Sequence, residues 1–419
     1  MKRIFDPIHR FIELDDGEVA LLGEPVVQRL RRLRQDGLAF LAFPSAEHSR
    51  FTHALGALAV GEKVLQRLRV AAPEAFASDA DFAAQRRLLR ASLLLHDLGH
   101  GPFSHACEAV LGMRHEARTT AILALPGLRA ALARLEVEPD EVLALVLGDE
   151  RCRYPVLREL VSGPNLDADR MDYLLRDAYF TGVEGGGYDF EQLVASLRIF
   201  EHGGRPALGV DWRGVHALEG FVLARYFMFS TVYFHHTTRQ FERVLHEALR
   251  ELWPQPRALD PIEEFLAWDD FRAFEGFRTL ATPAARAIRE RKPTHALVAE
   301  FNAARDLVAF ERVRTALATR FGESLWIDQQ EQLLHRLPLG AEGEAPTVLV
   351  RNFGGLVDAR EASDLIARLA GKAYWRKIFV GRTGNDCAEA RRIARAAVRA
   401  AGSGDERSGG VRGAVVTGT

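Results

Sequence analysis

The sequence predicts a mainly helical protein with a small α/β region near its C-terminus. Three observations favour this class. Apolar residues recur at intervals of three or four through most of the first 250 residues, as on the buried face of a helix. Prolines fall between or at the ends of these segments, where helices begin and end: Pro44, Pro73, Pro102, Pro126 and Pro139. Near residue 347 the pattern changes to β-branched residues and an Asn-Phe-Gly-Gly turn.

The individual elements follow from the same patterns. In chain order we expect helices over Glu24–Leu41, Phe51–Val70, Ala83–Leu95, Thr119–Leu135 and Asp140–Leu147. A further helix begins within Asn165–Asp169, and the glycine-rich loop Gly182–Gly187 follows it. The apolar stretch Trp212–Leu249 predicts one buried helix or a helix pair. Towards the C-terminus we expect strands at Thr347–Val350, Leu356–Asp358 and Tyr374–Val380, and helices at Ala362–Leu369 and Ala388–Ala401.

These patterns divide the chain into four regions. Residues 1–250 form the helical core, and residues 251–340 form a helical extension with interleaved charges. Residues 341–401 form the small α/β region. The Gly/Ser-rich tail, residues 402–419, is expected to be disordered.

Composition narrows the class of protein. The 419 residues are 47 % apolar and 27 % charged, which is ordinary for a globular protein. A net charge of −2 argues against a polyanion as the main partner. The three cysteines form no CxxC pair and the N-terminus lacks an apolar signal, so we expect a cytoplasmic location. No run approaches 18 apolar residues, so we expect no membrane span.

Histidines are concentrated near the N-terminus, where seven of the 14 lie within the first 115 residues. His53 follows Arg50 by three residues, and the adjacent pair His96-Asp97 ends an apolar helical run. Downstream, Asp169, Tyr173 and Asp177 recur every four residues and form one helical stripe about 12 Å long. Two imidazoles and two carboxylates neutralise a divalent cation and leave positions for water and a phosphate oxygen.

Simpler interpretations exist for single features. A lone His-Asp pair is a weak metal signal, and the arginines at 29–34 are typical of a solvated helix face. The aromatic residues between 226 and 234 are typical of a core. The order His53, His96-Asp97, Asp169 nevertheless resembles the HD phosphohydrolase superfamily. The resemblance extends to its dNTP triphosphohydrolase branch through motifs spread from residue 4 to about 250: DPIH at 6–9, HSRFTH at 48–53, HDLGHGPFSH at 96–105, His115-Glu116 and DADRMDYLLRD at 167–177.

The resemblance implies an HD-domain helical core and a role for each matching residue. The metal ligands would be His53, His96, Asp97 and Asp169. Catalysis at the α-phosphate would use His115 with Glu116 beside it, and His105 would protonate the leaving oxygen. Triphosphate binding would use Arg50, His100, Arg170 and Arg225, and sugar and base binding would use Tyr173, Asp177, Gln35 and Tyr233.

The resemblance also implies partners and a reaction. The family cleaves a dNTP to a deoxynucleoside and triphosphate with a divalent metal, Mn²⁺ or Mg²⁺ first and Fe, Ni or Co as alternatives. Its members are homo-oligomers, from dimers to hexamers. This chain departs from the family pattern at Arg170, where the family has lysine, at Asp36 beside the sugar site, and at Gly23, where activator-dependent members carry aspartate.

Two other functions stay open at the level of sequence. One is an HD phosphohydrolase that acts on a nucleoside monophosphate, a cyclic dinucleotide or an alarmone. The other is a nucleotide-sensing or nucleic-acid-binding protein, suggested by the arginines at 29–34 and 86–90.

Overall fold

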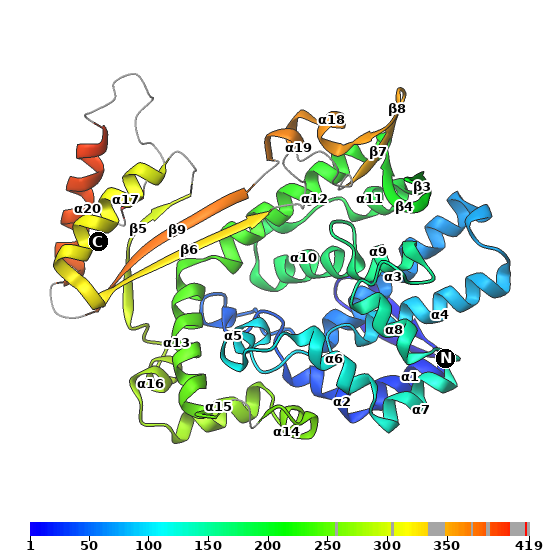
Figure 1. Cartoon of the computed structure of the whole chain (residues 1–419), viewed down its shortest axis with the longest axis horizontal. Coiled ribbons are helices and arrows are strands. Elements are labelled where there is room, and N and C mark those ends of the chain that lie inside the picture. The colour runs from blue at the N-terminus through cyan, green and yellow to red at the C-terminus, as the bar shows by residue number, and fades with distance from the viewer. Residues whose placement is uncertain are drawn as a thin grey trace.

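The computed structural model describes residues 1–255, 259–302, 306–333, 348–369, 372–382, 386–402 and 415–416. Helices and three small sheets make up these ranges, which confirms the mainly α class with a small α/β part. Figure 1 shows a large helical body and, at one end of it, a smaller unit in which α17 (Leu307–Phe321) and α20 (Asp386–Gly402) lie beside long strands. Within the described ranges, no helix combines the length and apolar character that a bilayer crossing requires.

The helical body begins with a hairpin and continues through consecutive helices. The hairpin pairs β1 (Lys2–Asp6) with β2 (Arg10–Leu14). The helices that follow are α1 (Asp16–Gly23), α2 (Pro25–Gln28), α3 (Arg50–Ala71), α4 (Asp79–Leu95), α5 (Glu108–Leu111), α6 (His115–Leu123), α7 (Pro126–Arg134), α8 (Pro139–Val146), α9 (Pro155–Ser162), α10 (Ala168–Thr181) and α11 (Phe190–Ser196). After β3 (Leu197–His202) and β4 (Arg205–Asp211) come α12 (Val215–Met228), a π-helical turn (Phe229–Tyr233), α13 (His236–Leu252), α14 (Ile262–Leu266), α15 (Asp270–Thr279) and α16 (Pro283–Arg289).

Three helices, α3, α4 and α10, form the centre of the body. Each begins at a residue whose side chain accepts a hydrogen bond from the first turn: Ser49 for α3, Ser78 for α4 and Asp167 for α10. All residues from Leu88 to Leu95 are buried, so the last two turns of α4 lie inside the core on every side. This burial delivers the residue after α4, His96, into the interior.

A close approach between α3 and α10 depends on Gly56. A Cβ at this position would clash with the carboxylate of Asp172 and the guanidinium of Arg176. The glycine therefore lets a charged face of α10 lie directly against α3. This contact fixes the spacing between two helices that carry predicted metal ligands.

The small unit is built on a four-stranded antiparallel sheet of order β10-β5-β9-β6. Its strands are β5 (His295–Phe301), β6 (Leu325–Leu333), β9 (Lys372–Gly381) and β10 (Val415–Val416). Its separate core lies between these strands and α17 and α20, and includes Val298, Phe310 and Ile378. Strand β9 also reaches the body, because the Trp375 ring lies 4.9 Å from that of Phe234.

The other four-stranded sheet has the order β3-β4-β7-β8 and lies on the body. In it, β7 (Leu349–Asn352) runs parallel to β4 and forms a hairpin with β8 (Gly355–Asp358). The short helices α18 (Ala359–Ala362) and α19 (Asp364–Leu369) follow. The predicted α/β region 341–401 therefore divides its strands between two sheets, β7 and β8 in one and β9 in the other.

Several predicted elements were wrong in detail. The helix expected over Glu24–Leu41 is α2 plus two 3-10 turns, because Arg29 is buried there and donates to the carbonyls of His100 and Trp268, both at 2.9 Å. The helix expected over Thr119–Leu135 is two helices, divided at Pro126, which begins α7.

Strands were the element most often missed. The region 251–340, expected to be helical throughout, contains β5 and β6. The β5 sequence HALVAEF is a short, nearly continuous apolar run, which periodicity alone does not separate from buried helix. The hairpins β1–β2 and β3–β4 were also not predicted. The predicted disordered tail lies outside the described residues except for Gly402 and Val415–Val416.

Candidate active site

Three predicted metal ligands meet where α3, α4 and α10 converge. His53 lies in the first turn of α3, His96 follows α4, and Asp169 lies in the first turn of α10. The Nε2 atoms of the two histidines are 3.2 Å apart, and Asp169 Oδ1 lies 2.9 Å from the first and 3.8 Å from the second. Adjacent ligands of an octahedral ion with bonds near 2.1 Å are separated by about 3 Å. The spacing therefore suits a divalent cation.

The Nδ1 atom of each histidine already makes a hydrogen bond to a protein group. His53 Nδ1 donates to Asp172 Oδ2 at 2.8 Å, and His96 Nδ1 donates to the Leu93 carbonyl at 2.8 Å. These bonds leave the Nε2 lone pairs facing Asp169, which is the tautomer that metal binding needs. Asp172 is itself held by His9 Nε2 at 2.6 Å and by Arg176 at 2.9 Å. Buried groups that are not predicted ligands therefore hold the His53 ring in place.

The fourth predicted ligand, Asp97, lies at the edge of this group. Its Oδ1 is 3.5 Å from His96 Nε2, and its Oδ2 is 3.8 Å from His53 Nε2. Asp97 Oδ2 also accepts a 2.6 Å hydrogen bond from Arg50 Nη1. Arg50, predicted to bind phosphate, therefore contacts a predicted metal ligand and Ser104 Oγ at 2.8 Å.

The electrostatics of the group favour a positive charge among its ligand atoms. Burial lowers the pKa of His53, but hydrogen bonds to Asp169 and Asp172 outweigh it and raise that pKa to about 10. Burial raises the pKa of Asp169, yet the two histidines hold it below its usual range. The carboxylate therefore stays ionised and stabilises a cation at the imidazoles. A divalent ion is a cation that these atoms can hold.

A second cluster lies next to the first, in the loop after Asp97 and the start of α6. His105, His115 and His100 direct their Nδ1 atoms at Glu108, which sequence reasoning missed. The His100 and His115 rings stack with centroids 3.9 Å apart. The missed signal was the i, i+3 spacing of His105 and Glu108, which places them on one face of a helical turn.

The loop that carries this cluster approaches α6 closely. A Cβ at Gly99 would clash with the backbone carbonyl of His115. Phe103 and Ser104 have positive φ angles, 59° and 60°, in the left-handed region that is uncommon for residues other than glycine. Glu116, the predicted neighbour of His115, has Oε2 3.5 Å from His115 Nδ1.

The predicted sugar-binding end lies further along α10. Asp177 Oδ2 accepts a 2.6 Å hydrogen bond from the Tyr233 hydroxyl, and Asp177 Oδ1 accepts one of 2.7 Å from His48 Nε2. The Tyr173 and Tyr233 rings lie 6.4 Å apart. Among the described residues, Asp36 Oδ2 and Gln35 Oε1 are buried without a hydrogen-bond partner. Burial and the nearby Asp177 raise the pKa of Asp36 to about 7.

The other predicted phosphate ligands have protein partners or lie beside aromatic groups. Arg170 donates to the Gly163 carbonyl at 2.6 Å and to Asp167, so its guanidinium is already held by two protein groups. Arg225 is buried, with its guanidinium carbon 5.5 Å from the centre of the Phe229 ring. Burial lowers the pKa of Arg225, and Arg170 nearby adds to this. The structure brings both arginines near Tyr173.

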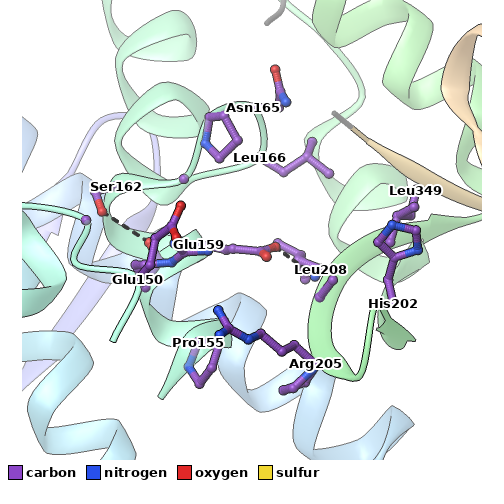
Figure 2. Close-up of a pocket in the computed structure, with 16 residues that line it drawn as sticks. Glu150, Pro155, Glu159, Ser162, Asn165, Leu166, His202, Arg205, Leu208 and Leu349 are labelled. Atoms are coloured by element: carbon purple, nitrogen blue, oxygen red, sulfur yellow. Dashed lines mark hydrogen bonds between the residues drawn. The ribbon is translucent and has the colours of Figure 1, made fainter. Parts of the chain in front are cut away.

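A separate cavity of about 470 Å³ lies between α9 and the β3–β4 hairpin. Figure 2 shows residues that line it, among them Arg205 and Glu159, whose carboxylate accepts a hydrogen bond from the backbone N–H of Leu208. None of the predicted site residues lines it.

Comparison with curated proteins gives partial matches. Residues 188–381 match a family model described as an HD associated region. An uncharacterized Bacillus subtilis protein, YwfO, is 37 % identical over 247 residues, covering 58 % of this chain and 54 % of that protein. The human deoxynucleoside triphosphate triphosphohydrolase SAMHD1 is 28 % identical over 233 residues, covering 48 % of this chain and 36 % of the human protein. The chain spans about half the length of the curated relatives it matches.

Solved structures match over nearly the whole chain. A hypothetical protein from Aquifex aeolicus has a TM-score of 0.79 and 29 % identity, covering 94 % of this chain and 99 % of that one. A phosphohydrolase from Bacteroides thetaiotaomicron shares the fold, with a TM-score of 0.71, 23 % identity and coverage of 91 % and 100 %.

Two histidines and one aspartate meet at the junction of three helices on a mainly α fold, in a group that could hold a metal ion. The family-model match and the curated relatives support an HD-domain phosphohydrolase related to the SAMHD1 proteins.

Proposed function

We propose that the protein is a metal-dependent dNTP triphosphohydrolase, which converts a dNTP to a deoxynucleoside and inorganic triphosphate. The observation that supports this most is the meeting of His53, His96 and Asp169 in one group, with Asp177 further along the same helix as Asp169. A metal group and a polar sugar site on one helix suit a substrate with a phosphate chain and a sugar.

Each group has a chemical task in this proposal. His53, His96, Asp97 and Asp169 would hold Mn²⁺ or Mg²⁺, with Fe, Ni or Co as alternatives. A bound divalent ion acidifies water and polarises a phosphoryl oxygen. Arg50, His100, Arg170 and Arg225 donate hydrogen bonds to the phosphates.

Other side chains carry out proton transfer and bind the sugar and the base in this proposal. His105, oriented by Glu108 at 2.8 Å, delivers a proton to the leaving 5′-oxygen, and His115 and Glu116 act beside the α-phosphate. Asp177, Tyr173, Tyr233 and Gln35 contact the sugar and base. By the family resemblance we also propose a homo-oligomer, and the free cysteines support a cytoplasmic location.

Product analysis tests the proposal. Purified protein is incubated with each dNTP and with Mn²⁺ or Mg²⁺, and the products are separated by ion-exchange chromatography. Deoxynucleoside and triphosphate in equal amounts support it. Monophosphate with pyrophosphate, or no turnover of any dNTP, contradicts it. A parallel panel of ribonucleotides, cyclic dinucleotides and alarmones tests the other HD substrates.

A further inference from the structure

One carboxylate from outside the predicted site bonds to two of its loops. Asp270 lies in the first turn of α15, and its side chain is fully buried. Its Oδ1 accepts a hydrogen bond from the backbone N–H of Phe103 at 2.8 Å, and its Oδ2 accepts one from the backbone N–H of Arg34 at 2.9 Å. Burial raises the pKa of Asp270 to about 6, and the two backbone hydrogen bonds oppose this rise. The side chain is therefore ionised at neutral pH, with both oxygens free to accept.

Each of these two loops carries a residue that is predicted to contact the substrate. Arg34 immediately precedes Gln35, which is predicted to contact the sugar. Phe103 lies two residues before His105, which is predicted to protonate the leaving 5′-oxygen. That oxygen joins the sugar to the α-phosphate, so the loops must keep a fixed separation if one substrate is to reach both. Asp270 bonds to one loop with each oxygen and therefore sets this separation.

The backbone at the histidine loop needs such support. Phe103 and Ser104 both have left-handed φ angles, which residues other than glycine keep only where neighbouring groups hold them. Ser104 Oγ donates to the Arg34 carbonyl at 2.6 Å and accepts from Arg50 Nε at 2.8 Å. The same turn therefore joins the two loops to each other and to the arginine that is predicted to bind phosphate.

The segment that carries Asp270 also reaches the histidine loop at a second point. The Trp268 carbonyl accepts a hydrogen bond from Arg29 Nε at 2.9 Å, and Arg29 Nη1 donates to the His100 carbonyl at 2.9 Å. The segment thus contacts the loop directly at Phe103 and through a buried guanidinium at His100. Two contacts fix the direction of the loop as well as its distance.

We propose that Asp270 is a positioning residue, which holds residues 33–36 and 97–105 in register through two backbone N–H groups and does not touch the substrate. This inference rests on the proposed function, because that function assigns Gln35 and His105 to the substrate. It gives α15, which follows the helical core in the chain, a task in the site. Loss of the link displaces groups on both loops, and a displacement of about 1 Å reduces turnover by up to about 100-fold.

Two asparagine variants of the full-length protein test the proposal. Asp270→Asn keeps the shape but leaves one acceptor for two N–H groups, because the other oxygen becomes an NH₂ group. Asp269→Asn is the matched control, since it removes the same charge one residue earlier, where the carboxylate accepts from the Arg272 N–H at 2.9 Å and pairs with Arg32. Amide hydrogen exchange, steady-state kinetics with dNTPs and calorimetric titration with Mn²⁺ compare both variants with the wild type.

The expected changes are confined to the loops and to turnover. In Asp270→Asn, exchange at residues 33–36 and 97–105 should be faster by about tenfold or more. Its kcat/KM should fall by about 10- to 100-fold. Its Mn²⁺ affinity should stay within about twofold of the wild type, because the ligands His53, His96 and Asp169 make no bond to Asp270. The control should match the wild type in all three measurements.

Wild-type exchange at both loops in a folded Asp270→Asn protein would overturn the proposal. So would unchanged kcat/KM despite faster exchange, equal changes in both variants, or a loss of Mn²⁺ affinity as large as the loss of turnover, which indicates general disruption. If circular dichroism shows that Asp270→Asn is unfolded, Asp270→Ser, which shortens the side chain without adding an amide N–H, decides by the same readouts. Exchange and metal binding require no turnover. If the wild type hydrolyses no dNTP, the proposed function fails, while faster exchange at both loops still supports the link through Asp270.

Discussion

Asp172 should control metal affinity although it is not predicted to touch the metal. Its carboxylate is fully buried and accepts hydrogen bonds from His53 Nδ1 at 2.8 Å, His9 Nε2 at 2.6 Å and Arg176 Nε at 2.9 Å. Asp172→Asn keeps the shape but removes the charge that orients His53 and makes its Nε2 more basic. Changes at such carboxylates reduce metal affinity by about 10- to 100-fold. At about 1.4 kcal/mol per tenfold, the loss is about 1.4–2.8 kcal/mol.

The same substitution weakens a buried ion pair, so stability must be separated from affinity. Breaking such a pair costs about 3–5 kcal/mol when one charge is left alone. Here Asp6 still contacts Arg176 at 2.9 Å, so we expect a smaller loss. Asp6→Asn is the matched control, since Asp6 bonds to the same guanidinium but not to His53.

Isothermal titration of metal-free protein with Mn²⁺ measures the affinities, and urea unfolding measures stability. We expect both variants to lose stability, but only Asp172→Asn to lose 10-fold or more in affinity for Mn²⁺. Wild-type affinity in a folded Asp172→Asn protein, or equal losses in both variants, would refute the view that Asp172 prepares His53 for the metal.

Further predictions address packing, charge and the sugar site. Gly56→Ala should destabilise the fold by about 1–3 kcal/mol, because the added Cβ would clash with Asp172 and Arg176. Gly23→Ala is the control and should cause no such loss, because nothing lies within 4 Å of its added Cβ. Thermal unfolding compares the two variants, and equal effects would contradict the close contact at Gly56. The raised pKa of Asp36, about 7 against 3.8 when unfolded, stabilises the fold at low pH, and this contribution is lost as pH rises towards 7. The stability of Asp36→Asn relative to the wild type should therefore increase between pH 5 and 8, and a constant difference would count against the raised pKa. Asp177→Ala should raise the KM for dNTPs, as measured by steady-state kinetics; an unchanged KM would argue that Asp177 does not contact the sugar.

The central helices could be predicted because local signals agree there. Apolar spacing and capping residues mark α3, α4 and α10, and the histidines and aspartates follow at helix ends. The meeting of His53 with Asp169, 116 positions apart, depends on tertiary packing, and only the family resemblance indicated it. The packing itself depends on Gly56, whose role is invisible without α10 beside it.

Other features of the fold and the site were visible in the local sequence only in part or not at all. The i, i+3 spacing of His105 and Glu108 is present in the sequence, but the left-handed conformations of Phe103 and Ser104 just before it are not signalled by their side chains. Arg29 reads as part of a solvated face, but it is buried and bonds to the backbone of the loop that carries the site. Strand β5 was missed because it is a short, nearly continuous apolar run, which periodicity alone does not separate from a buried helix.

The measurement that tests the central claim most directly is product analysis of dNTP turnover by metal-loaded protein, with bound metal quantified in the same samples. The account predicts deoxynucleoside and triphosphate from the wild type. It also predicts that His96→Ala and Asp97→Ala lose both turnover and the ion held by the His53 group. Turnover in a folded His96→Ala protein, or monophosphate and pyrophosphate from the wild type, would contradict it.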